Sequence, residues 1–408
     1  MVEIDAYNEA IKSGQYEKPA GLQGKYDNVR RFWEDEQLGL YMQPYLEQVV
    51  ARKKEQGKGL RIMDLGCGSG DGFELLMAIN RSQPLACEHK TKLLEPGMVE
   101  FYKGIDINQE LLEQARGIYG KNENMVFVQA DFNEFDFRAE EHYDLYLATY
   151  GTLSHNADEQ TVELLSNIAK HGASGAIIVI DWLGRYSYEW QTLWANELGQ
   201  EQWMDYVISY IYTDSARKQQ ELTSFPLRIM GRREALAIYR HANRKAGGAI
   251  VLRGLYDRSS FVGRHMDTAQ YNRHCQPLRG TVNSLFELGV RTDLERVLIN
   301  YVPRESFPEV NAYHRRLADC WNYLVEYVIA LLSGDEAPSA LPQMPPRLRR
   351  SLSTMKWLVR AAGSVKIGDP RANLIEPQLG YCLRELEMGL QQGLGCGHGL
   401  VAIFELVK

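Results

Sequence analysis

A glycine-rich turn in the first half of the chain is the strongest sign of a ligand site. It runs Asp64-Leu65-Gly66-Cys67-Gly68-Ser69-Gly70-Asp71-Gly72 and follows an apolar stretch at 60–65. Glycine lets the backbone bend sharply and lets a ligand approach closely, because it has no Cβ. The helix expected after the turn presents unpaired N–H groups and the positive end of its dipole. The turn therefore predicts a site for a nucleotide or nucleoside.

The spacing of these glycines argues against a diphosphate ligand. A dinucleotide fingerprint needs glycine at its first, third and sixth positions, but the sixth residue counted from Gly66 is Asp71, which would repel a diphosphate. No Gly-Lys-Ser/Thr follows, which excludes a Walker loop. A cation-bearing nucleoside fits better, because Asp64 and Asp71 suit an ammonium group and the glycine backbone suits a carboxylate and a sugar.

Two further acids lie at the ends of later predicted strands. Asp106 ends a strand at 100–107, where a carboxylate can accept two hydrogen bonds from a ribose diol. Asp131 follows a strand at 125–129, where it could accept from an exocyclic amine while the Phe132 backbone N–H donates to the ring. Ile107 would pack on the adenine face. Since parallel strands end at one edge of a sheet, these residues predict a single crevice with Asp64.

Four motifs in chain order carry a family resemblance. They are Asp64-Leu65-Gly66-Cys67-Gly68-Ser69-Gly70, Gly104-Ile105-Asp106, Gln129-Ala130-Asp131-Phe132 and Tyr143-Asp144-Leu145-Tyr146. In this order and at strand ends they resemble the successive motifs of class I S-adenosylmethionine-dependent methyltransferases. The resemblance covers about 26–181 together with the terminal pair of strands. It implies a methyltransferase that uses S-adenosyl-L-methionine as its cofactor.

The resemblance also implies roles for single residues. Asp64 and the glycines would contact the methionine moiety, Asp106 the ribose, and Asp131 with Phe132 the adenine. Tyr26 joins them because methyltransferases of this kind often close an N-terminal helix over the cofactor. The spacing from Gly70 to Asp106 is longer than usual in the family, which predicts a surface insertion at 82–97. The predicted cofactor-binding residues are Tyr26, Asp64, Gly66, Gly68, Gly70, Asp106, Ile107, Asp131, Phe132 and Thr149.

The elements that position these residues alternate between strand and helix. Strands are expected at 60–65, 100–107, 125–129, 143–149, 176–181, 249–256 and 400–407. Alternation of this kind predicts an α/β fold with a doubly wound, seven-stranded, Rossmann-like methyltransferase sheet. The segment 186–222 is aromatic and irregular, and roughly 276–394 is helical. A lone final strand is stable only when it pairs, so we expect it beside 249–256, with the helical region inserted between the two.

Four segments follow from this reading. Residues 1–56 are an N-terminal helical segment over the cofactor site, and 57–264 are the Rossmann-like core. Residues 265–396 are the helical insertion, which could serve as a lid, a substrate-binding unit or a dimerisation element. Residues 397–408 return the last strand to the core sheet.

Two histidines are candidates for catalysis. A hydroxyl acceptor needs a base, whereas a carboxylate does not. His155 follows the fourth strand closely; alternatively, Ser154 caps the next helix and His155 only lines its first turn. His265 follows the sixth strand, where it could act as a base beside Arg264; alternatively, this segment is a polar junction that ties the insertion to the core. The predicted substrate-binding residues are Tyr150, Trp182 and Arg264.

Composition narrows the class of substrate and partner. The net charge of −7 argues against a large nucleic-acid surface, so no DNA partner is expected. Six scattered cysteines and an acidic N-terminus with no apolar core after it favour a cytoplasmic protein without a membrane segment. The spacing of His265, Asp267 and His274 matches no standard zinc pattern, so no metal is expected. The helical insertion could mediate a homodimer.

A basic stretch at 347–371 keeps other partners open. It has seven Lys or Arg residues against one acid, Asp369. A solvated helix face would explain it, but so would attraction of an anionic substrate or an acidic carrier protein. The preferred hypothesis is methylation of a small organic molecule on oxygen, at a hydroxyl or a carboxylate. The alternatives are a protein, carrier-bound or RNA substrate, or a cofactor-binding fold relative that transfers no methyl group.

Overall fold

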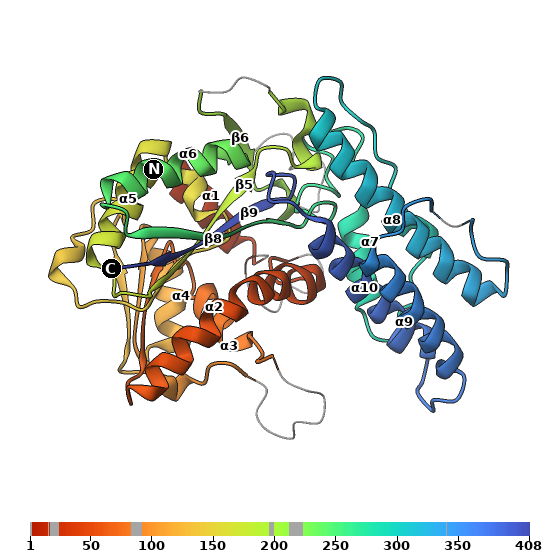
Figure 1. Cartoon of the computed structure of the whole chain (residues 1–408), viewed down its shortest axis with the longest axis horizontal. Helices are drawn as coiled ribbons and strands as arrows, with labels where there is room; N and C mark the ends of the chain where they lie inside the picture. The colour runs from red at the N-terminus through yellow and green to blue at the C-terminus, as the bar shows by residue number, and fades with distance from the viewer. Residues whose placement is uncertain are drawn as a thin grey trace.

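The computed structural model describes residues 2–14, 16, 24–82, 92–195, 200–211, 223–339 and 341–408. Two structural parts lie side by side (Figure 1): a twisted sheet with helices on both faces, and a unit of long helices at one end of it. Cys87, Tyr212 and most of the insertion expected at 82–97 lie outside the described residues. Within the described ranges, no helix has the length and apolar character needed to cross a membrane.

The sheet has the predicted order of seven core strands. They are β1 Leu60–Leu65, β2 Val99–Asp106, β3 Met125–Gln129, β4 Leu145–Ala148, β5 Ile177–Gly184, β8 Ile250–Arg258 and β9 Gly399–Leu406. The order β3-β2-β1-β4-β5 is parallel throughout. The last strand, β9, lies antiparallel between β5 and β8. The prediction that it returns across the helical insertion to pair with the sixth core strand is confirmed.

Alternating side chains on the strands build one core on each face of the sheet. Ile177 and Val179 of β5 pack under the helices of one face, and Ile178 and Ile180 pack under those of the other. This alternation follows from the two-residue repeat of a strand, and full burial on both faces explains why these strands are almost wholly apolar. The helices of the first face are α2 Asp35–Glu55, α3 Asp71–Ala78 and α4 Gln109–Tyr119, and those of the second are α5 Asp158–His171 and α6 Arg232–Lys245.

A hairpin that the sequence reading missed extends the sheet beside the site. It consists of β6 Trp203–Val207 and β7 Ser224–Met230. β4 pairs with one edge of β5, but only as far as Ile180 of β5. Beyond Ile180, this edge of β5 is not covered by β4. β7 fills this edge by pairing parallel with Leu183 and Gly184. The segment 186–222, read as irregular, therefore contains β6, and β7 just after it forms a wall at the carboxyl end of β5.

The helical insertion has its own core. Its helices are α7 Leu278–Leu285, α8 Pro308–Ser333, α9 Pro346–Ala362 and α10 Glu376–Leu390. The predicted buried stripe of α8, which includes Leu317, Trp321 and Leu324, lies in this core. Val29 and Trp33, next to and within the π-helical turn Arg30–Glu34 that precedes α2, belong to the same core. The N-terminal segment therefore joins the insertion to the sheet.

Buried ion pairs strengthen the same junction. Arg279 of α7 donates to Asp27 at 2.8 Å and to Glu34 at 2.7 Å, and all three side chains are almost fully buried. Burial by itself raises the pKa of Glu34, but Arg279, Arg264 and Arg258 hold it well below its usual range. Removing one partner would leave a buried charge without compensation, which is costly.

The four segment boundaries proposed from the sequence stay predictions.

Candidate functional site

A cavity of about 320 Å³ lies at the carboxyl edge of the sheet, a size typical of small-molecule sites. Its walls come from the glycine turn, the ends of β2 to β5, the hairpin, and the chain around β8 and β9. Helix α1, Val2–Lys12, contributes Tyr7. Of the predicted site residues, the cavity brings together Asp64, Gly66, Gly68, Asp106, Ile107, Asp131, Phe132, Thr149, Tyr150, His155 and Arg264. Tyr26, Gly70, Trp182 and His265 are not among its lining residues.

The glycines of the turn serve two different purposes. Gly66, Gly68 and Gly70 all have positive φ, at 66°, 52° and 92°. A Cβ on Gly66 would lie 2.5 Å from the Thr152 side chain, and one on Gly70 would lie 2.5 Å from the Tyr119 ring. At Gly68 the nearest atom would be 3.8 Å away. Two of the glycines therefore let protein segments pack closely, and Gly68 leaves room on the cavity side.

Asp106 is held at the rim by backbone donors. Its Oδ2 accepts from the Gly68 N–H at 2.8 Å, and its Oδ1 accepts from the Asn108 N–H at 2.8 Å. Burial raises the pKa of Asp106, although these two hydrogen bonds oppose the rise. Each carboxylate oxygen keeps a further lone pair, because a carboxylate offers about four acceptor sites. The side chain can therefore still accept from two hydroxyl groups.

Asp64 lies deeper, under the first turn of α3. Its Oδ2 accepts from the Tyr102 hydroxyl at 2.6 Å, and a Cβ on Gly72 would come within 2.3 Å of it. Burial raises the pKa of Asp64 to about 7; the Tyr102 hydrogen bond opposes this, and the charges of Asp71 and Asp106 add to it. Near neutral pH this group therefore exchanges a proton readily, and a nearby cation would favour its ionised form.

Asp71, expected to face a ligand ammonium group, is neutralised by the chain itself. Lys25 Nζ lies 2.5 Å from its Oδ2, Arg30 Nη2 lies 3.6 Å away, and the Tyr26 hydroxyl donates to Oδ1 at 2.5 Å. Burial raises the pKa of Asp71, but Lys25 and Arg30 outweigh this and hold it below its usual range. Tyr26 thus acts through Asp71.

Lys25 and Arg30 line the cavity themselves, and the sequence reading missed both. The Arg30 guanidinium lies 3.6 Å from the centre of the Tyr150 ring, a cation–π contact. Tyr150 holds this position with a φ of 62°, which is unusual for a residue with a side chain. The only sequence signal was their place on either side of Tyr26. These two cations suit a ligand carboxylate.

The rim beyond Asp106 is open and apolar. Ile107 is 40% exposed at the end of β2, while Phe132 is buried. Asp131 is exposed, and its Oδ1 accepts from the Asn133 N–H at 2.8 Å. The role of these residues in holding the adenine stays a prediction.

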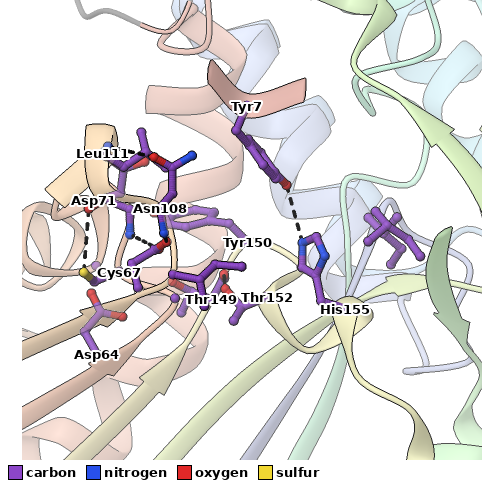
Figure 2. Close-up of a pocket in the computed structure, with 18 of the residues that line it drawn as sticks. Tyr7, Asp64, Cys67, Asp71, Asn108, Leu111, Thr149, Tyr150, Thr152 and His155 are labelled. Carbon is purple, nitrogen blue, oxygen red and sulfur yellow. Dashed lines mark hydrogen bonds between the residues drawn. The ribbon is translucent and has the colours of Figure 1, made fainter. Parts of the chain in front are cut away.

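Helix α1 covers part of the cavity near His155. Figure 2 shows Tyr7 reaching down from this helix toward His155, and its hydroxyl lies 3.5 Å from His155 Nε2. The His155 ring also stacks on Phe225 of β7, with ring centres 5.9 Å apart. Ser154 accepts from the Leu183 N–H at 2.8 Å. The reading of Ser154 as a helix cap is wrong, since Ala157 is the N-cap of α5.

His265 and Trp182 lie away from the cavity. His265 is fully buried against the rings of Tyr206, Tyr210 and Tyr271. Burial lowers the pKa of His265 to about 3, so its ring is neutral. Trp182 is in the core under the α5 and α6 face of the sheet. The surroundings of His265 match a polar junction better than a base in contact with substrate.

A second group of lining residues, called the acceptor end below, comes from segments far apart in the chain. Its apolar wall includes Leu183, Tyr206, Ile208, Tyr210 and Leu227, and its polar residues include Arg258, Arg264 and His398. The Arg264 Nη2 donates to the Lys25 carbonyl at 2.8 Å, and the Arg258 Nη2 donates to Asp181 at 2.7 Å. The sequence reading named only Arg264. Within the described ranges, no three His, Cys, Asp or Glu side chains are grouped so as to hold a metal ion.

Comparison with known families identifies the core. Residues 56–223 match a family model described as a methyltransferase domain. This confirms the resemblance stated from the four motifs: these residues are a class I, Rossmann-like, S-adenosylmethionine-dependent methyltransferase domain, whose cofactor is S-adenosyl-L-methionine. The segments 1–55 and 224–408, which include the helical insertion and the last two core strands, lie outside the match. No curated protein matches the chain.

Several solved structures share part of the fold. An S-adenosylmethionine-dependent methyltransferase from Clostridium acetobutylicum is 12% identical over 52% of this chain and 83% of its own, with a TM-score of 0.33. The amino pentose methyltransferase CalS10 from Micromonospora echinaspora is 13% identical over 54% and 86%, with a TM-score of 0.30.

Proposed function

We propose that this protein transfers a methyl group from S-adenosyl-L-methionine to an oxygen atom of a small organic molecule. The observation that carries the proposal is a single cavity lined both by the motif acids and by a group of apolar side chains. The cofactor supplies a methyl group that is already activated on a sulfonium. Positioning and exclusion of water by the chain can then supply much of the rate enhancement.

The residues of the glycine turn and the acids at the strand ends, together called the cofactor end, fit this cofactor. Asp106 has lone pairs available for the ribose hydroxyls, and Gly68 leaves space beside it. Lys25 and Arg30 suit the methionine carboxylate, and Asp64, whose pKa is raised by burial, suits the ammonium group. Ile107, Asp131 and Phe132 would hold the adenine. In Figure 2, Thr149 and Tyr150 lie between Asn108 and His155.

The other end suits a compact acceptor with an apolar body. Leu183, Ile208 and Leu227 offer apolar surface, and Arg258 and Arg264 are already paired with Asp181 and Glu34. A carboxylate acceptor needs no base, whereas a hydroxyl acceptor does. Two histidines that line the cavity, His155 and His398, are the candidates for that base. We further propose a cytoplasmic location, which the scattered single cysteines of the sequence favour.

Two measurements test the proposed function. Calorimetry should detect binding of S-adenosyl-L-methionine and of S-adenosylhomocysteine. Mass spectrometry should then detect S-adenosylhomocysteine formed during incubation with a panel of hydroxyl and carboxyl compounds. Binding of the cofactor without turnover on any compound, including protein and RNA fractions, would favour a fold relative that transfers no methyl group.

A second candidate keeps the chemistry but delivers the acceptor on an acidic carrier protein. The outward side of α9 carries Arg349, Arg350, Lys356 and Arg360 beside Trp357, which is 68% exposed. An exposed tryptophan among cations is typical of a protein-binding surface. Charge reversal at Arg350 and Lys356 should then abolish transfer to the carrier-bound acceptor and spare the free one. Equal transfer by this variant and the wild type would exclude the carrier.

We also propose that the protein forms a homodimer through the helical insertion, which analytical ultracentrifugation would test.

A further inference from the structure

A buried carboxylate stands directly behind one of the two cavity histidines. His398 lies between Gly397 and Gly399 at the start of β9, and its side chain lines the cavity. Its Nδ1 lies 2.8 Å from Oε1 of Glu189. Glu189 is fully buried in the short helix Tyr188–Leu193, which follows β5. The two residues are more than two hundred positions apart in the sequence, so only the fold brings them together.

Glu189 is held in place by several donors. Besides His398, it accepts from the His265 backbone N–H at 2.6 Å and from the Ser187 hydroxyl at 3.0 Å. Burial raises the pKa of Glu189, but His398 and the other donors outweigh this and hold it below its usual range. Glycine is required opposite the pair, because a Cβ on Gly263 would come within 2.0 Å of Glu189 Oε1. The carboxylate is therefore ionised and fixed in position.

The histidine is equally well fixed. Its backbone N–H donates to the Ser259 carbonyl at 3.0 Å, and its carbonyl accepts from the Gly184 N–H at 3.0 Å. Since an ionised carboxylate can only accept, the proton of the neutral ring lies on Nδ1. Nε2 then carries the lone pair that can accept a proton.

We propose that His398 is the catalytic base for a hydroxyl acceptor and that Glu189 positions it; this inference rests on the proposed function. His398 Nε2 takes the hydroxyl proton while the acceptor oxygen forms a bond to the methyl carbon and the methyl–sulfur bond breaks. The products are a methyl ether, S-adenosylhomocysteine and a proton, which the imidazolium releases to solvent. The surrounding walls of Leu183, Tyr206 and Tyr210 suit a phenol or another hydroxyl on an apolar ring.

The other two histidines are less suited to this step. His155 has its Nε2 turned toward Tyr7 of α1, as Figure 2 shows. His265 does not line the cavity, and its backbone N–H serves the same Glu189. Only His398 combines a place in the lining with a hydrogen bond from Nδ1 to a buried carboxylate, among the histidines that the structure describes.

The tautomer of His398 tests the inference without turnover. The full-length protein, labelled with ¹⁵N histidine and saturated with S-adenosylhomocysteine, should show by nuclear magnetic resonance a ring with its proton on Nδ1. That ring is identified by its loss in His398→Gln. The matched control is His241→Gln, since His241 is exposed on α6. A ring of His398 protonated on Nε2 at neutral pH would overturn the inference. If His398→Gln fails to fold, the same resonance is identified by its loss in His398→Asn.

A phenol probe tests the acceptor class in the same samples. 4-Nitrophenol absorbs visible light only as the phenolate, so binding beside His398 should raise the phenolate band in the wild type and in His241→Gln. His398→Gln should lose this increase, and Glu189→Gln should weaken it. Failure of the probe to perturb the His398 resonance overturns the hydroxyl-acceptor class. Loss of S-adenosylhomocysteine binding in the wild type would instead overturn the proposed function, so the two failures are distinguishable.

Discussion

The two ends of the cavity are built in contrasting ways. The cofactor end comes from short local motifs, in which each acid lies at or near the end of the strand that positions it: Asp64 is the penultimate residue of β1, and Asp106 ends β2. The acceptor end is assembled from Leu183, Arg258 and His398, which belong to three distant segments. A local motif can specify a cofactor site by itself, but the acceptor site depends on how the hairpin and the helical insertion close the sheet.

The charges at the two ends differ as well. At the cofactor end, burial raises the pKa values of Asp64 and Asp106 more than the surrounding hydrogen bonds and charges lower them. At the acceptor end, Glu34 and Glu189 have lowered pKa values, because arginines and a histidine accompany them. The first end is thus completed by a cationic ligand. The second end is already balanced and suits a neutral acceptor.

The sharpest way to separate the two ends is to replace His398 by Gln. We expect kcat for a hydroxyl acceptor to fall by about 10²- to 10⁴-fold, the usual contribution of a general base, with little change in cofactor affinity. Steady-state kinetics and calorimetry on one preparation measure both quantities. His155→Gln should lower kcat by only about tenfold. Equal losses in the two variants would contradict the assignment of the base to His398.

The converse variant, Asp106→Ala, should affect only the cofactor end. Two hydrogen bonds from ribose hydroxyls to a carboxylate are worth about 3 kcal/mol together, so S-adenosylhomocysteine should bind roughly 100-fold more weakly. Calorimetry measures the affinity, and circular dichroism checks that the loss of the Gly68 hydrogen bond leaves the fold intact. Asp131→Ala, at an exposed position, is the milder comparison. Unchanged affinity in Asp106→Ala would remove the ribose assignment.

The cofactor end should also respond to pH. A carboxyl group with a pKa near 7 is largely protonated below that pH, and a bound cation favours its ionised form. Binding of S-adenosyl-L-methionine therefore releases a proton, and affinity should rise as pH increases from about 6 to about 7 and level off near 8, by up to about tenfold. Calorimetry in buffers of different ionisation enthalpy counts the proton. Asp64→Asn should remove the dependence, and a dependence that survives in it would contradict this origin.

A smaller effect is expected where the N-terminal segment meets the cofactor end. Tyr26→Phe removes the hydroxyl that donates to Asp71, a hydrogen bond to a charged group worth about 1.5 kcal/mol. We expect about a tenfold loss of cofactor affinity and a small fall in Tm. Tyr45→Phe, whose hydroxyl is exposed and bonds to Arg253 and Tyr256, is a matched control. An equal effect of both variants would argue against the link through Asp71.

The least effect is expected far from both ends. The double variant Arg350→Glu with Lys356→Glu changes two exposed residues of α9, neither of which is among the residues that line the cavity. Transfer to a free small acceptor should stay within about twofold of the wild type, because surface substitutions seldom perturb the fold. A large loss with a free acceptor would place α9 in the catalytic cycle itself.

Two features of the structure were not predicted from the sequence, and each has a physical reason. β7 contains Phe225, Leu227 and Ile229 at alternate positions, but Pro226 within the run argues against a strand. It is tolerated here because the strand pairs with the end of β5 only at Ile229 and Met230, beyond the proline. The glycine turn was recognised, yet Gly66 and Gly70 are needed for packing against Thr152 and Tyr119, contacts that no spacing reveals.

The amino-acid sequence by itself determined the order of the core strands, the helical insertion and the acids of the cofactor end. Each of these depends on a local pattern: a run of apolar residues, a glycine turn, or an acid at the end of a strand. Only the tertiary structure decided that Lys25 and Arg30 neutralise Asp71, that His265 lies outside the cavity, and that Glu189 stands behind His398. The residues of each pair lie in segments that no local sequence pattern links. Their burial and pairing arise only when the chain packs into its tertiary structure.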